Sequence, residues 1–147
     1  MLIRLGRWLR AAGYDTALAD ESSTDKSLVN QAIKENRVLI TRDRKLLEIR
    51  HADNVTIYLN CNDTEQCLEE LSKKCKINWL LKPFSRCMNC NYPLKEAEKH
   101  QYNQVPEKAR KHIETLLFCQ YCNKLYWNGS HVKHMYEKLQ GWQQKYH

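Results

Sequence analysis

The chain has 147 residues, a length typical of one domain or of a small domain with an appendage. Hydrophobic residues make up 42% and charged residues 28% of the chain, a composition that is typical of folded proteins and excludes a disordered chain. Four glycines and three prolines exclude a linker or low-complexity protein. No apolar run approaches the roughly 20 residues that span a bilayer, and arginines interrupt the N-terminal apolar stretches, so we expect a cytoplasmic protein with no membrane anchor or secretion signal.

Charge and aromatic residues are distributed unevenly. Residues 1–80 carry 13 basic and 12 acidic side chains, whereas residues 81–147 carry 11 basic and 5 acidic ones. The second segment also holds 10 of the 14 aromatic residues. Lysine and arginine bind phosphates and aromatic rings stack on bases. The sequence therefore predicts two modules, 1–80 and 81–147, of which the second binds nucleic acid.

The first predicted elements are a helix and a short strand. Apolar residues recur at helical spacing over residues 2–12, and Gly13 follows in the position typical of a helix end. Residues 16–19 are expected to form a strand. A polar loop leads from there to a second helix, which Ser23 or Thr24 caps.

The elements that follow alternate between strand and helix. The apolar run 38–41 predicts a strand buried on both faces. A short helix is expected at 45–49, a strand at 55–59 and a helix from 63 to about 76. This β–α–β–α–β–α order predicts an α/β fold with a parallel sheet flanked by helices.

Acidic residues follow the predicted strands. Asp20 and Glu21 come after the first strand, Asp43 comes after the second, and Asp25 opens the helix between them. The carboxyl ends of parallel strands share one edge of a sheet, where open α/β folds place their ligand sites. We therefore expect these carboxylates to gather there. The basic residues beside Asp43 are Arg42, Arg44 and Lys45.

Clustered carboxylates suit a hard cation such as Mg²⁺ or Mn²⁺. Such an ion activates water and polarises a phosphodiester, and the adjoining basic residues would hold the substrate backbone. The alternative is that Asp25 favours the helix dipole, that Asp20 and Glu21 are solvated loop charges, and that Asp43 belongs to the first turn of its own helix.

Two CxxC pairs in the second segment are typical of a metal-binding site. Cys87 with Cys90 and Cys119 with Cys122 are separated by 28 residues. Two such knuckles can place four thiolates around one Zn²⁺ ion, as in a zinc ribbon. Disulfides would require an oxidising compartment, and a redox CxxC would explain only one pair. The sequence predicts a structural four-cysteine zinc site with no open position.

Three further cysteines are interpreted as core residues. Cys67 and Cys75 fall on the apolar stripe of the predicted helix from residue 63, and Cys61 ends a strand. Packing in the core is therefore the expected role of all three.

Several aromatic residues surround the knuckles and have two interpretations. They either form the small core of the ribbon or provide a stacking surface, and we expect core packing for about half of them. These residues are Tyr92, Tyr121, Tyr126 and Trp127.

Two groups of basic residues are interpreted as solvated helix faces. Arg4, Arg7 and Arg10 form a stripe on the first helix, with phosphate contact as the alternative. His131 and His134 share one face of a C-terminal helix but have no third ligand nearby.

Several segments resemble the Mut-seven C-terminal RNase family, whose members are similar to PIN-domain nucleases with an appended zinc ribbon. The resemblance covers nearly the whole chain in order. The segments that carry it are residues 5–16 (LGRWLRAAGYDT), 25–28 (DKSL), 39–44 (LITRDR), 83–87 (PFSRC), 119–122 (CQYC) and 126–131 (YWNGSH).

The resemblance implies a PIN-like sheet, divalent-metal-dependent hydrolysis of phosphodiester bonds and RNA as the substrate. By position, Asp25 and Asp43 match acidic site residues of the family, with Arg42 and Arg44 beside them. Asp20 has no such match, and its role rests on the topology. The implied organisation is a PIN-like RNase domain over 1–80 and a zinc ribbon with a basic tail over 81–147.

One feature departs from the family pattern. Members usually begin with a short strand that ends in an aspartate just before a Met-Leu pair, whereas Met1 and Leu2 open this sequence. Either the true start of the protein lies upstream of Met1, or the chain is a degenerate copy of such a nuclease that binds RNA without cleaving it. The first explanation agrees better with a stable fold, because losing a central strand would uncover apolar faces. We expect a metal-dependent ribonuclease, with a non-catalytic zinc-ribbon RNA-binding protein as the alternative.

Overall fold

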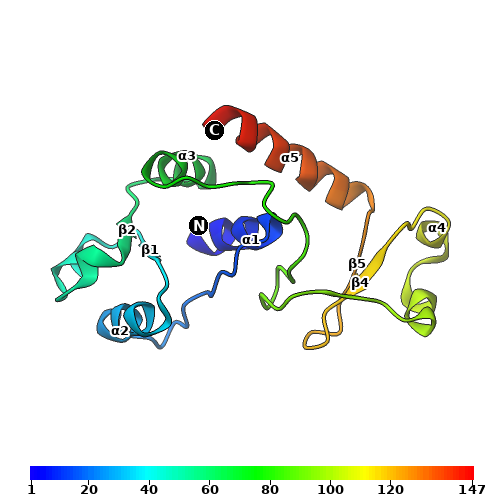
Figure 1. Ribbon diagram of the computed structural model, residues 1–147, viewed down its shortest axis with the longest axis horizontal. Helices are drawn as coiled ribbons and strands as arrows, with labels where there is room; N and C mark the ends of the chain where they lie inside the picture. The colour runs from blue at the N-terminus through cyan, green and yellow to red at the C-terminus, as the bar shows by residue number, and fades with distance from the viewer. The chain divides into compact units, whose positions relative to one another are not determined.

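A computed structural model describes all 147 residues (Figure 1). The chain divides into two compact units. The first unit comprises mainly residues 1–6 and 17–77, and the second comprises mainly residues 7–16 and 78–145. Residues 7–16 precede most of the first unit in the sequence but belong by contact to the second.

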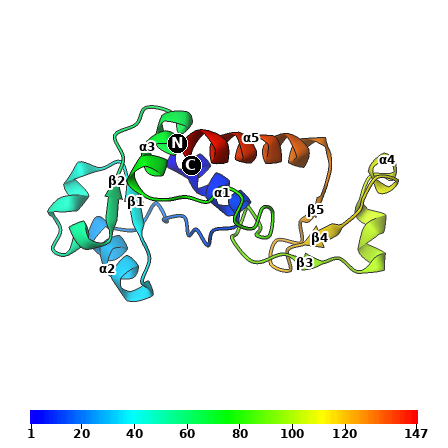
Figure 2. The same cartoon turned by 45° about the horizontal axis from the view of Figure 1, so that its top comes forward.

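The first unit is built around a small parallel sheet. Strands β1 (Leu39–Thr41) and β2 (Thr56–Tyr58) pair in parallel, with Ile40 opposite Ile57. Helices flank this pair (Figure 2), which confirms the predicted α/β class. The flanking helices are α2 (Asp25–Glu35) and α3 (Thr64–Lys74), and the β1–β2 connection contains the 3₁₀ helices η1 (Arg44–Glu48) and η2 (Ala52–Asn54).

Local signals explain where these helices begin and end. The Thr24 side chain accepts a hydrogen bond from the backbone N–H of Ser27 at 3.1 Å and caps α2, as predicted. Asn36 ends α2 in the left-handed conformation, with φ of 54°. Asp63 caps α3 by accepting from the backbone N–H of Gln66 at 2.8 Å. A core cluster of this unit combines Val29, Leu46 and Ala52 with Leu39, Ile49 and Val55.

Two predictions about the sheet are wrong. Residues 16–19 are irregular and not a strand, because the backbone of Thr16 bonds to side chains: its N–H donates to Asn91 Oδ1 at 2.9 Å and its carbonyl accepts from Arg10 Nε at 2.8 Å. The run 38–41 is not buried on both faces, since Val38 is 64% exposed and lies outside β1.

The second unit contains an antiparallel sheet of three strands in the order β3–β4–β5 (Figure 2). Helix α1 (Leu2–Ala12) runs from the first unit into the second, as predicted for residues 2–12. The remaining elements are β3 (Lys95–Glu96), η3 (Lys99–Gln104), α4 (Glu107–Arg110), β4 (Leu116–Phe118), β5 (Leu125–Trp127) and α5 (Ser130–Tyr146).

A tryptophan cluster joins α5 to the second part of α1. The ring of Trp142 lies edge-on to Trp8 at a centroid distance of 4.7 Å and to Trp79 at 5.4 Å. Gly13 ends α1 at φ of 106°, and a Cβ atom there would lie 2.6 Å from the carbonyl oxygen of Lys82. The close approach of these two backbone segments requires glycine. No helix has the length and apolar character needed to cross a membrane.

Candidate functional site

The two CxxC knuckles fold identically. In the first, the N–H of Cys87 donates to the carbonyl of Tyr92 at 2.8 Å, and the N–H of Asn91 donates to the carbonyl of Cys87 at 2.8 Å. The asparagine that follows each pair is left-handed, a conformation that asparagine tolerates better than most residues. The second knuckle repeats this pattern with bonds from Cys119 N–H to the Lys124 carbonyl (3.0 Å) and from Asn123 N–H to the Cys119 carbonyl (2.8 Å).

The knuckles bring four sulfur atoms together. The Sγ atoms of Cys87, Cys90, Cys119 and Cys122 all lie within 4.8 Å of one another, and none of them is in a disulfide. Cys90 and Cys119 are 3.2 Å apart, and Cys87 and Cys122 are 3.9 Å apart. Zinc–sulfur bonds of about 2.3 Å in a tetrahedron place the sulfurs about 3.8 Å apart. The cluster therefore fits a metal ion such as zinc.

The surroundings favour the thiolate of Cys87 and disfavour that of Cys90. Burial raises the pKa of Cys87, but bonds from the Tyr126 hydroxyl at 3.0 Å and from backbone N–H groups outweigh it, and the pKa falls to about 7. Burial and the neighbouring sulfurs raise the pKa of Cys90 to about 12. The amide of Asn89 donates to the sulfur of Cys122 at 3.3 Å. Deprotonated thiols are the form that binds metal.

Arg10 supports the first knuckle from α1. Its side chain is only 4% exposed, and its Nη1 atom donates to the carbonyls of Met88 at 3.0 Å and Asn89 at 3.1 Å. Arg10 also bonds to Thr16, as described above. Arg4 and Arg7 are exposed. The interpretation of the arginine stripe as a solvated face is therefore wrong for Arg10, which is buried because the three carbonyls satisfy its guanidinium.

The aromatic residues around the knuckles divide into two pairs. Tyr126 and Trp127 of β5 are partly buried, and Tyr126 bonds to Cys87. Tyr92 and Tyr121 are exposed and stack on each other. Both roles considered from the sequence therefore occur, one in each pair.

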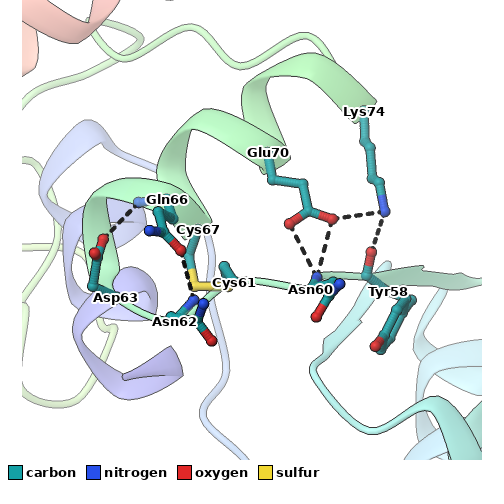
Figure 3. The surroundings of a disulfide bond; sticks show 9 residues. All are labelled: Tyr58, Asn60, Cys61, Asn62, Asp63, Gln66, Cys67, Glu70 and Lys74. Atoms are coloured by element: carbon teal, nitrogen blue, oxygen red, sulfur yellow. Dashed lines mark hydrogen bonds and ion pairs between the residues drawn. A yellow bond between two sulfur atoms is a disulfide. The ribbon is translucent and has the colours of Figure 1, made fainter.

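Two of the three cysteines interpreted from the sequence as core residues form a disulfide in the first unit. Cys61 and Cys67 are buried and form a disulfide, with a Cα–Cα distance of 5.2 Å (Figure 3). The bond joins the chain after β2 to the first turn of α3. Cys75 is a partly buried free thiol, and burial raises its pKa. Only Cys75 therefore remains a thiol in this unit.

The predicted catalytic carboxylates all lie in the first unit and are exposed. Asp43 lies two residues after Thr41, the last residue of β1, and its Oδ1 atom accepts from the backbone N–H of Lys45 at 3.0 Å. Asp25 is the first residue of α2. Asp20 lies in the loop before α2 and accepts from the backbone N–H of Ser22 at 3.1 Å. Each carboxylate therefore lies in a loop or at the first turn of a helix.

Basic side chains accompany Asp43. Arg42, Arg44 and Lys45 are exposed. The guanidinium of Arg44 lies 5.6 Å from the ring centre of Tyr58, the last residue of β2. Lys74 of α3 lies 5.7 Å from the same ring and forms an ion pair with Glu70 at 3.0 Å. Two cations from separate elements therefore lie near the carboxyl end of the sheet. Lys74 is absent from the sequence-based set of candidates.

The cysteine cluster is the only group of three or more metal-ligating side chains in the structure. Asp20, Asp25 and Asp43 do not bring three ligand atoms together. Chemically, the cysteine cluster can hold a soft metal ion, and the sheet edge offers carboxylates with cations beside them.

Comparison with known proteins gives one match. A family model described as the Mut7-C RNAse domain matches residues 1–139. Comparison with curated proteins found no match, and comparison with solved structures found none either. The match spans both units, the carboxyl end of β1 and both knuckles. This chain therefore belongs to the Mut7-C RNAse domain family.

Proposed function

We propose that this protein hydrolyses phosphodiester bonds of RNA with the help of a divalent cation. The observation that carries the proposal is the match to an RNase domain family over residues 1–139, which includes each residue assigned a role below. The parallel pairing of β1 with β2 supports it further, because open α/β sheets bind ligands at the carboxyl ends of parallel strands.

In this proposal Asp25 and Asp43, aided by Asp20, hold Mg²⁺ or Mn²⁺ through carboxylate oxygens. When bound there, such a cation would lower the pKa of water and stabilise charge on the phosphate. Two observations support a role for Asp43. It lies two residues after the carboxyl end of β1, and exposed cationic side chains flank it. Arg42, Arg44 and Lys45 orient the RNA backbone, since guanidinium and ammonium groups bind phosphate oxygens.

The four cysteines hold a structural Zn²⁺ ion in the second unit. Four protein ligands complete a tetrahedral shell, so no position is open for catalysis. The ion stabilises the fold of both knuckles, and the basic segment 81–147 contributes binding to RNA.

A second candidate function is binding of RNA without cleavage. The observation that favours it is that the carboxylates do not form a group of three metal ligands. Both candidates predict RNA binding that weakens with salt, because phosphate contacts release counterions. Only the first predicts cleavage that depends on a hard cation.

A cleavage assay with end-labelled single-stranded RNA separates the two candidates. The protein is loaded with zinc, freed of excess metal and then titrated with Mn²⁺ or Mg²⁺, so that the cysteine site stays filled. We expect cleavage to require the added cation. Asp43→Asn should lower the rate by at least about 100-fold, because an amide is a weaker ligand for a hard cation. Its affinity for RNA should stay unchanged.

Asp53→Asn is the matched control. Asp53 is also exposed, but it lies in η2 before β2, at the amino end of the sheet. Its replacement should leave cleavage unchanged. Cleavage by Asp43→Asn at the wild-type rate would remove Asp43 from the proposed site. Binding of RNA by the wild type without cleavage at any cation concentration would favour the second candidate.

A further inference from the structure

Two tyrosines form an exposed stack on the ribbon. The ring centres of Tyr92 and Tyr121 are 3.7 Å apart, and the ring planes are inclined by 26°. Tyr92 is 45% exposed and Tyr121 is 60% exposed. The partly buried residues Tyr126 and Trp127 already supply aromatic packing beside the cysteines. The exposed pair is therefore not needed to cover the metal site.

The cysteine cluster holds both tyrosines in place. The carbonyl of Tyr92 accepts the hydrogen bond from Cys87 that closes the first knuckle. Tyr121 lies inside the second knuckle, between Cys119 and Cys122. The bound metal would fix both backbone segments. The rings therefore lose little conformational entropy when a ligand binds, which favours recognition by rigid aromatic contacts.

One face of each ring is covered by the other ring, and the large exposure of Tyr121 indicates that much of its remaining surface is open. A flat aromatic ligand can continue this stack at the same spacing.

The surroundings favour an anionic ligand. Lys124 is exposed directly after the second knuckle, next to Asn123. Residues 81–147 carry 11 basic and 5 acidic side chains. A flat group attached to a negatively charged chain describes a nucleotide within a single strand. In duplex RNA the bases are already stacked and paired, and they would not reach the platform.

We propose that Tyr92 and Tyr121 form a stacking platform for a base of single-stranded RNA, with Lys124 contacting the adjacent phosphate. This assignment rests on the proposed RNA binding and names the residues and the form of RNA involved. Stacking of a base on an aromatic side chain tolerates any sequence, because every base has a π-face. The platform therefore recognises unpaired strands and not a particular sequence.

The test measures binding of the zinc-loaded full chain to a fluorescent single-stranded RNA of about 12 nucleotides, within the usual site sizes. Tyr121→Ala should weaken binding by roughly 5- to 150-fold, the effect of losing one stacked base. Tyr121→Phe should bind like the wild type, because it keeps the ring. Tyr136→Ala, which removes an exposed tyrosine of α5, is the matched control and should have no effect.

Two further measurements separate stacking from charge and from folding. Lys124→Ala should reduce the salt dependence of binding, whereas Tyr121→Ala should leave its slope unchanged. All variants should retain one equivalent of zinc. Binding of duplex RNA should be the same for Tyr121→Ala and the wild type.

Each remaining outcome contradicts the assignment in a distinct way. If Tyr121→Ala binds single strands as tightly as the wild type, the platform is wrong but the proposed RNA binding stands. If Tyr121→Phe is as weak as Tyr121→Ala, the hydroxyl and not the ring is responsible. If the wild type binds neither form of RNA, the platform and the proposed RNA binding both fail.

Discussion

Replacement of Arg10 by methionine tests how far the metal-binding knuckle depends on α1. The side chain is 4% exposed and donates three hydrogen bonds to carbonyls, those of Thr16, Met88 and Asn89, at 2.8 to 3.1 Å. Methionine keeps much of the apolar stem but leaves all three carbonyls without this donor.

The expected loss of stability follows from these bonds. A hydrogen bond to a charged group contributes about 1.5–3 kcal/mol, and such contributions are not additive within one network. A buried carbonyl left without its donor costs a further penalty of about 1–3 kcal/mol. We therefore expect the free energy of unfolding to fall by about 3–5 kcal/mol in Arg10→Met. Zinc should also leave faster, because the first knuckle loses its support and the thiolates lose a nearby cation.

Urea unfolding of the zinc-loaded protein, with a chromogenic chelator reporting release of the ion, measures both effects. Arg7→Met is the matched control, since Arg7 lies on the same helix but is exposed, and a surface substitution of this kind changes stability by no more than about 0.5 kcal/mol. Arg10→Lys should be intermediate, because it keeps the charge but not the planar fork. Equal stability of Arg10→Met and Arg7→Met would refute the reasoning.

Two other predictions concern the backbone and the disulfide. Gly13→Ala should destabilise the protein by at least about 2 kcal/mol in thermal melts, because alanine is strained at φ of 106° and its Cβ would lie 2.6 Å from the Lys82 carbonyl oxygen. Gly141→Ala, in the open middle of α5, should instead stabilise the protein by about 0.5–1 kcal/mol in the same melts. A Gly13→Ala variant more stable than Gly141→Ala would contradict both predictions. Replacing Cys61 and Cys67 together by alanine should lower the stability of the oxidised protein by about 2 kcal/mol, as expected for a loop this short. If the unfolding midpoint of the wild type is the same with and without reductant, the disulfide does not stabilise the protein. Because a reducing cytoplasm would keep this pair as thiols, alkylation in intact cells followed by mass spectrometry also tests the location expected from the sequence.

Local sequence signals predict most of the elements and the cysteine cluster. The apolar spacing of residues 2–12 determines α1, and Thr24 caps α2 as its position suggests. The two CxxC pairs predict the metal site because each knuckle is closed by backbone hydrogen bonds within six residues of chain. The bonds made by Cys87 and Cys119 illustrate this. Such features depend on near neighbours, and therefore they can be read from a sequence.

Features that depend on distant partners were not predictable. Arg10 repeats the spacing of the exposed arginines, and only its contact with a knuckle about 80 residues later makes it buried. Residues 16–19 have the character of a strand but bond to side chains through Thr16. The disulfide is a different case, because Cys61 and Cys67 are only six residues apart. Their spacing across a strand end and a first helical turn is the signal that identifies the bond in retrospect.

The central proposal is that carboxylates of the first unit hold a hard divalent cation. The most direct test is an anomalous difference map from crystals of the zinc-loaded protein soaked in Mn²⁺, recorded on the wild type and on Asp43→Asn. The proposal predicts a manganese peak beside the carboxylates of Asp25 and Asp43 in the wild type and its loss in the variant. A well-ordered wild-type crystal with no manganese peak beside these carboxylates would contradict it.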